Sequence, residues 1–144
     1  MAIINPYLNF MGNTEEAFNF YKSVFGGEFA MLMRFKDTPE ADKLPANEQD
    51  KIMHVALPIG KGNVLMATDA LESMGHKLTE GNNYSISIHT ETKEEADQLF
   101  NGLSAGGNVE VPLAQAFWGD YFGMCQDKFK INWMMSYNAK SHQG

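Results

Sequence analysis

Few side chains in this sequence could carry out acid–base or nucleophilic chemistry: it has four histidines and one cysteine. His89 ends the segment YSISIH (84–89), whose alternation of polar and apolar residues is typical of a β-strand. Side chains two positions apart in a strand share a face, so Ser85, Ser87 and His89 point the same way. There His89 can donate to a ligand oxygen or act as a general base, or it is a partly exposed strand end.

The other reactive groups lack such neighbours. Cys125 has no histidine at a spacing that predicts a nucleophile–base pair, and free cysteines are commonly small buried hydrophobic residues. His54 and His76 are expected to be solvated. The segment IGKGNV (59–64) contains Gly-x-Gly but lacks the third glycine and the following helix of a nucleotide-binding loop, so we interpret it as a hairpin turn. No methyltransferase-type nucleotide motif is found elsewhere.

Two further segments leave alternatives open. FWGDYFG (117–123) concentrates aromatic side chains around two turn-forming glycines. These rings either pack in the core, line the rim of a ligand pocket, or lie against a second chain, where tryptophan and tyrosine are enriched. The acidic, proline-containing stretch 36–51 is either a surface loop or a lid over a cavity.

An internal repeat predicts the elements that position these groups. NTEEAFNFYKSVFGG (13–27) and TKEEADQLFNGLSAG (92–106) align without a gap, and both have apolar residues at helical spacing. Each begins with a cap residue, Asn13 or Thr92, followed three positions later by glutamate, which is the spacing of a capping box. The first helix is followed by Gly26 and Gly27 and the second by Gly106 and Gly107, and such glycine pairs are suited to a helix C-terminus.

Strands are predicted before and after each helix, so each half has the order β-α-β-β-β. The predicted strands are 7–10, 28–35, 53–60 and 63–69 in the first half, and 84–89, 108–115, 121–126 and 130–137 in the second. The fold class is therefore α+β: two tandem βαβββ modules, about residues 1–72 and 80–138, that form a curled mixed sheet in a single domain and are followed by a polar tail (138–144). A sheet face without a helix must be covered by its twin or by a partner chain.

Composition excludes several classes. The chain has 144 residues, 44% hydrophobic residues and a net charge of −7. An acidic chain of this kind predicts no nucleic-acid partner, because phosphate binding depends on lysine and arginine, and no membrane partner. Apolar runs are too short to span a bilayer, and the single cysteine excludes an internal disulfide, so we expect a cytoplasmic protein.

The repeat and three ordered motifs resemble the vicinal oxygen chelate superfamily of glyoxalases, extradiol dioxygenases and bleomycin-resistance proteins, and especially its PhnB-like branch. The motifs are PYLNFMGNTEEAFNFYKSVFGGEF (6–29), NVLMATD (63–69) and FWGDYFGMCQDKFKINWMM (117–135). The resemblance implies a cavity inside the curled sheet and, as is usual in this family, a homodimer. PhnB-like proteins often carry the label 3-demethylubiquinone 3-methyltransferase-like.

The resemblance also implies where a divalent cation would be held, on the first and last strands of each module. Those positions fall at or beside Pro6, Met66, Ser85 and Met134. Proline has no side-chain donor, and thioethers are poor ligands for Zn, Mn, Mg or Fe(II), which prefer imidazole and carboxylate. We therefore predict no metal and no other cofactor. Met66 and Met134 either face one another across an apolar, adaptable cavity or are ordinary core residues.

We predict a metal-free protein that binds an unidentified small molecule, with no catalytic residue assigned. The ligand would be small and partly aromatic or apolar, with one polar group met by Ser87 or His89. The alternatives are a divergent lyase or dioxygenase, a metal-independent acid–base catalyst using His89, or a protein that sequesters a drug. The predicted contact residues are Phe10, Met66, Ser87, His89, Trp118, Tyr121 and Met134.

Overall fold

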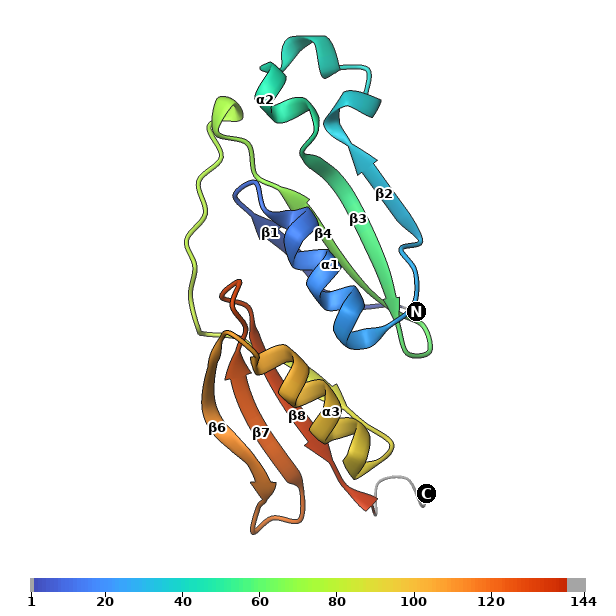
Figure 1. Ribbon diagram of the computed structural model, residues 1–144, viewed down its shortest axis with the longest axis vertical. Coiled ribbons are helices and arrows are strands. Elements are labelled where there is room, and N and C mark those ends of the chain that lie inside the picture. The colour runs from blue at the N-terminus through green and yellow to red at the C-terminus, as the bar shows by residue number, and fades with distance from the viewer. Residues whose placement is uncertain (1, 140–144) are drawn as a thin grey trace. The chain divides into compact units, whose positions relative to one another are not determined.

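The computed structural model describes residues 2–139 and divides the chain into two compact units, Met1–Thr79 and Glu80–Gly144 (Figure 1). Each unit is a four-stranded mixed sheet with one long helix. The elements of the first unit are β1 (Tyr7–Phe10), α1 (Thr14–Phe25), β2 (Met31–Arg34), the 3₁₀ helices η1 (Phe35–Asp37) and η2 (Ala41–Lys43), α2 (Ala46–Gln49), β3 (Ile52–Ile59), β4 (Asn63–Asp69) and η3 (Glu72–Met74). Those of the second are β5 (Ile86–His89), α3 (Lys93–Ser104), β6 (Asn108–Gln115), β7 (Tyr121–Gln126) and β8 (Asn132–Tyr137).

Strand order is the same in both units, β1-β4-β3-β2 and β5-β8-β7-β6. The first and last strands of each unit pair in parallel, and the other pairs are antiparallel. The predicted βαβββ order and the α+β fold class are confirmed. The structure shows one open four-stranded sheet in each unit. Part of the predicted polar tail, from residue 140 on, lies outside the described residues.

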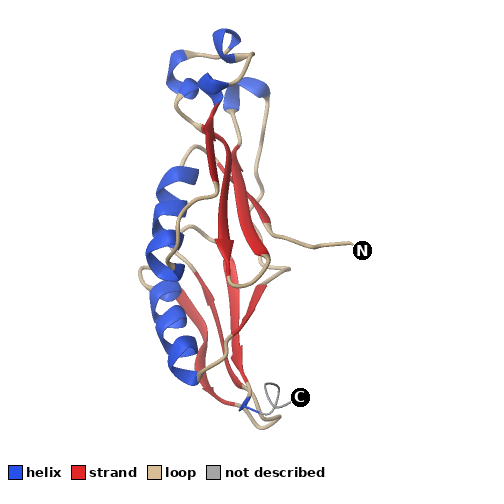
Figure 2. Cartoon of the chain, turned by 90° about the vertical axis from the view of Figure 1, so that its right-hand side faces the viewer, coloured by secondary structure: helices blue, strands red, loops and turns tan. Residues whose placement is uncertain are grey.

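Each long helix covers one face of its own sheet (Figure 2). In β4, Leu65, Ala67 and Asp69 are buried, whereas the alternate residues Met66 and Thr68 are partly exposed. The buried set meets the apolar stripe of α1, where Ala17, Phe18 and Tyr21 are fully buried. Burial of each large apolar side chain contributes about 1.5–3 kcal/mol, so this packing is a main source of the unit's stability. We call the opposite face of each sheet the helix-free face. In β4 it carries the side chains of Met66 and Thr68.

The two helices begin in different ways. Thr92 caps α3 as predicted, since its hydroxyl accepts a hydrogen bond from the Glu95 amide at 3.1 Å. The cap predicted at Asn13 is wrong, because the Asn13 side chain makes no capping bond. Asp69 at the end of β4 replaces it and accepts from both the amide (3.0 Å) and the hydroxyl (2.6 Å) of Thr14. A buried carboxylate thus joins the start of α1 to the sheet.

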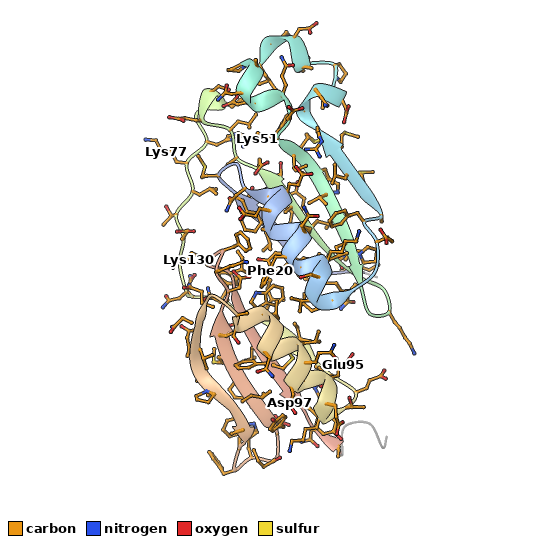
Figure 3. The ribbon with its side chains drawn as sticks, viewed as in Figure 1. Phe20, Lys51, Lys77, Glu95, Asp97 and Lys130 are labelled. Atoms are coloured by element: carbon orange, nitrogen blue, oxygen red, sulfur yellow. The ribbon has the colours of Figure 1, made fainter. Side chains whose placement is uncertain are left out.

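The stretch 36–51 belongs to the first unit alone and is folded into η1, η2 and α2. Its last residue, Lys51, donates to the Gly12 carbonyl at 2.9 Å and so ties this stretch to the turn between β1 and α1 (Figure 3). The turn predicted at 59–64 is confirmed as the β3–β4 hairpin. Between residues 2 and 139, no helix has the length and apolar character needed to cross a membrane.

Candidate functional site

A pocket of about 550 Å³ lies on the helix-free face of the first sheet. It is built entirely within the first unit. Its lining residues come from β1, β3, β4, η1 and the segment 70–78 that follows β4: Tyr7, Asn9, Phe35, Met53, Thr68, Asp69, Ala70, Met74, His76, Lys77 and Leu78.

Strand alternation explains the floor of the pocket. Tyr7 and Asn9 alternate with the buried Leu8 and Phe10 of β1, so they point away from α1. Asn9 is paired in register with Thr68 of the neighbouring β4, which places both side chains on the same face. The Tyr7 ring is 47% exposed and lies 5.8 Å from the His54 ring, centroid to centroid. The floor therefore offers hydroxyl, amide and aromatic surface together.

The 70–78 segment forms a wall, and two interactions fix its path. Glu48 of α2 is only 7% exposed and accepts hydrogen bonds from both the amide and the hydroxyl of Ser73. Within the segment, the Leu71 amide donates to Nδ1 of His76 at 2.9 Å. Met74 at the end of η3, and His76 and Leu78 in the irregular chain after it, consequently contribute to the pocket.

Asp69 lines the pocket without offering its carboxylate to it. Its Oδ1 atom accepts from Thr14, and its Oδ2 atom accepts from the Ile52 amide at 2.7 Å. The residue is 2% exposed. Because these donors occupy both oxygens on the helix side of the sheet, Asp69 is a structural residue. It is not available as a general base for a ligand in the pocket.

Five of the predicted contact residues lie on helix-free faces or at a sheet end. Met66 pairs in register with Tyr7, beside the pocket floor. In the second unit Ser87 pairs with Met134, and His89 Nδ1 lies 3.2 Å from the Ser136 hydroxyl. Trp118, in the β6–β7 turn, donates to Asp120 at 2.9 Å. Contact of a ligand with Met66, Ser87, His89, Trp118 and Met134 stays a prediction.

The other two predicted residues pack on the helix side of their sheets. Phe10 is 4% exposed and meets Phe18 of α1 edge to face, with centroids 6.5 Å apart. Tyr121 donates its hydroxyl to Asp97 of α3, which raises the pKa of the tyrosine, and the Lys93 ammonium lies 4.9 Å from its ring centroid. Ligand contact by these two rings stays a prediction that their packing does not support.

Sequence reasoning missed most of the pocket. The signal for Tyr7 and Asn9 was present, since they alternate with apolar residues in YLNF and belong to the exposed set. Thr68 follows the same logic on β4. Met53 does not, because it lies two and four residues before the buried Val55 and Leu57 of β3, and strict alternation would place it on the helix side. Nothing in the sequence signals Phe35 or His76, because irregular segments with no periodicity carry them.

The residues at the expected cation positions do not fit a hard or borderline metal. Pro6 offers a backbone carbonyl, and that group accepts from the Met66 amide at 3.1 Å. Met66 and Met134 offer thioethers, and Ser85 offers a single hydroxyl. Within residues 2–139, no three or more His, Cys, Asp or Glu side chains are grouped so that they could hold a metal ion.

The family model described as 3-demethylubiquinone-9 3-methyltransferase matches residues 2–136. The chain belongs to this family. Protein PA1353 from Pseudomonas aeruginosa is 38% identical, with a TM-score of 0.83 over 96% of this chain and 98% of its own. Protein YjdN of Escherichia coli (strain K12) is 29% identical and aligns over 92% of this chain and 93% of its own.

The Bacillus cereus protein described as a putative 3-demethylubiquinone-9 3-methyltransferase, PhnB protein, is also similar to this chain. It is 27% identical, with a TM-score of 0.76 over 94% of this chain and 99% of its own. A glyoxalase-related enzyme from Fulvimarina pelagi shares the fold, with a TM-score of 0.61 at 16% identity over 96% of this chain and 89% of its own. The PhnB-like branch and the glyoxalase-like fold are therefore confirmed.

Proposed function

We propose that this protein binds a small, partly apolar molecule in the pocket of the first unit and that it does so without a metal. The observation that carries this proposal is the pocket itself. Three apolar side chains from separate parts of the first unit, Phe35 of η1, Met53 of β3 and Leu78 of the 70–78 segment, line the pocket together with the polar Asn9 and Thr68 of its floor. Concave sites with a mainly apolar lining and a few placed polar groups are typical of ligand pockets.

Methyl transfer, which the family description mentions, is not carried over to this chain. The glycine pair Gly60 and Gly62 forms the tight turn between β3 and β4, with a strand following it. A nucleotide-type cofactor is usually held where a glycine-rich loop opens a helix, so this turn does not fit one. The proposal assigns binding and no reaction.

A pair of matched substitutions tests the proposed site. The probe is N-phenylnaphthylamine, a neutral aromatic molecule whose fluorescence rises in apolar surroundings. We expect saturable binding to the wild type and a loss of about tenfold or more in affinity for Thr68→Phe, because the larger ring fills the pocket. The control is Ser87→Phe, which makes a similar change on the helix-free face of the second sheet.

Each outcome of this test is informative. Loss of binding in Thr68→Phe together with retention in Ser87→Phe supports the pocket of the first unit. The reverse pattern would place the ligand on the second sheet, among the contacts predicted from sequence, and would overturn the proposal. Circular dichroism of both variants separates loss of a site from loss of the fold.

We also infer a homodimer and a cytoplasmic location. Support for the dimer comes from exposed aromatic surface, since Phe117 is 96% and Trp118 is 53% exposed in the β6–β7 turn. Sedimentation of the wild type and of Phe117→Ser/Trp118→Ser tests it, and a monomeric wild type would contradict it. The lone Cys125 thiol is buried, as suits a reducing compartment. Cell fractionation tests the location.

A further inference from the structure

We propose that the pocket selects an anionic ligand: an apolar molecule that carries one carboxylate, sulfonate or phosphate group. This inference rests on the proposed function and names the chemical class of its ligand. It follows from a contrast between the charge of the whole chain and the charge of the pocket lining. The chain is acidic, with 18 Asp and Glu against 11 Lys and Arg.

The pocket lining directs no carboxylate toward a ligand. Asp69 is the single acidic side chain among the lining residues in the described part of the chain. Its carboxylate lies on the helix side of the sheet, where Thr14 and Ile52 donate to both oxygens. In a protein with net charge −7, the charged group that this lining can present to a ligand is therefore the ammonium of Lys77, because both oxygens of Asp69 accept hydrogen bonds from Thr14 and Ile52.

His76 supplies a directed donor. Its Nδ1 atom accepts the Leu71 amide proton at 2.9 Å, so in the neutral ring the remaining proton is on Nε2. The imidazole is thereby oriented by the backbone of the segment that carries it. A residue whose acceptor nitrogen is already used offers a ligand a donor and no acceptor, which favours an oxygen anion over a hydrogen-bond donor.

Lys77 supplies the positive charge. The side chain lines the pocket, and Figure 3 shows it extending outward from the 70–78 segment. Among residues 2–139 the Lys77 ammonium forms no salt bridge with a carboxylate. A flexible four-carbon stem lets this charge turn toward a ligand at the pocket rim. His76 and Lys77 are consecutive, so one segment carries both groups.

Two probes with the same ring system separate this inference from the proposed function. Anilinonaphthalene sulfonate carries a sulfonate that N-phenylnaphthylamine lacks. We expect the sulfonate probe to bind the wild type more tightly, and we expect Lys77→Gln to weaken it by about two- to fivefold, the range of an exposed ion pair. Binding of the neutral probe should not change. Lys61→Gln, which removes an exposed lysine from the β3–β4 turn, is the matched control.

A salt titration of the wild type provides a second measurement that needs no variant. The affinity for the sulfonate probe should fall as ionic strength rises, whereas that for the neutral probe should not. Equal affinity for the two probes, or equal effects of Lys77→Gln and Lys61→Gln, would overturn the anionic class while leaving the proposed function in place. If neither probe binds, both proposals are wrong.

Discussion

Glu48 and Ser73, 25 residues apart in the chain, are joined by two hydrogen bonds to one carboxylate. Glu48 Oε2 accepts from the Ser73 amide at 3.2 Å, and Oε1 accepts from the Ser73 hydroxyl. Glu48 belongs to α2, and Ser73 lies in η3, within the 70–78 segment that walls the pocket. The acidic stretch 36–51 is therefore an anchor for the pocket wall.

We expect Glu48→Gln to destabilise the protein by about 1–3 kcal/mol, because the amide group places a donor against one of the two donors of Ser73 and leaves a buried group unsatisfied. Probe binding in the pocket should weaken as well, since the wall loses its anchor. Chemical denaturation and fluorescence titration measure the two effects. Glu72→Gln, an exposed change in the same 3₁₀ helix as Ser73, is the control, and equal effects of the two substitutions would contradict the anchoring role.

Two substitutions of His76 separate its structural bond from its role as a donor. Asparagine can place its carbonyl oxygen where Nδ1 stands and still accept the Leu71 amide proton, but it has no group at the position of Nε2. We expect His76→Asn to keep the stability of the wild type and to weaken the sulfonate probe by about two- to fivefold. His76→Ala should lose stability and binding together. Unchanged sulfonate affinity in His76→Asn would remove His76 from the ligand site.

Asp69→Asn should be among the most harmful conservative changes in the first unit. The carboxylate accepts hydrogen bonds from Thr14 and Ile52, and an amide group in the same place turns one acceptor into a donor that faces an N–H. We expect a loss of about 2–4 kcal/mol in the free energy of unfolding. Urea denaturation measures the loss. The exposed Asp42→Asn is the control and should change stability by less than about 0.5 kcal/mol.

Because the Cys125 thiol is buried, we expect the unfolding free energy of the protein to fall at alkaline pH. Burial, with a smaller contribution from Asp127, raises the pKa of this thiol to about 11. A thiol whose pKa is raised on folding stabilises the folded state at pH values below its unfolded pKa, and that contribution is lost as the pH rises through the folded pKa. The unfolding free energy of the wild type should therefore fall between about pH 9 and 11 more steeply than that of Cys125→Ala. Parallel curves for the two proteins would contradict the assignment.

Gly107 tests how closely two segments of the second unit approach. A Cβ atom at this position would lie 2.2 Å from the Gln126 carbonyl oxygen and 2.8 Å from the Asp127 carbonyl carbon, and both contacts are with backbone. We expect Gly107→Ala to cost about 3 kcal/mol or more, measured by thermal and chemical unfolding. Gly81→Ala is the matched control, because its Cβ would meet only the Asn83 side chain, at 3.9 Å.

Local patterns predicted the elements of this fold well. The helical spacing in 13–27 and 92–106 corresponds to α1 and α3, and the predicted strands 63–69 and 121–126 coincide with β4 and β7. The predicted strand 28–35 shrinks to the four residues of β2. Periodicity succeeds wherever one face of an element is buried, because burial alone creates the pattern.

Contacts between residues far apart in the chain could not be predicted from the sequence. The cap of α1 comes from Asp69, 55 residues away from Thr14, and no local spacing announces it. Glu48 anchors the pocket wall and is buried, yet nothing in the sequence distinguishes it from the other charged residues of the stretch 36–51. Phe10 is among the predicted contact residues, and the pairing of β1 with β4 turns its ring toward α1. Such pairings depend on tertiary packing, which a single sequence does not display.

The acidic stretch 36–51 occurs in the first repeat and has no counterpart in the second, which makes the two repeats different in what they can support. Two copies of a βαβββ unit are interchangeable as scaffolds as long as their connections match. The first unit alone contains residues 36–51, with Glu48 inside them, so the two units are not equivalent. A hybrid gene made of two second halves would encode both sheets and lack the anchor. The two halves thus share one framework, and the sixteen residues 36–51 restrict this support of an irregular segment to the first half.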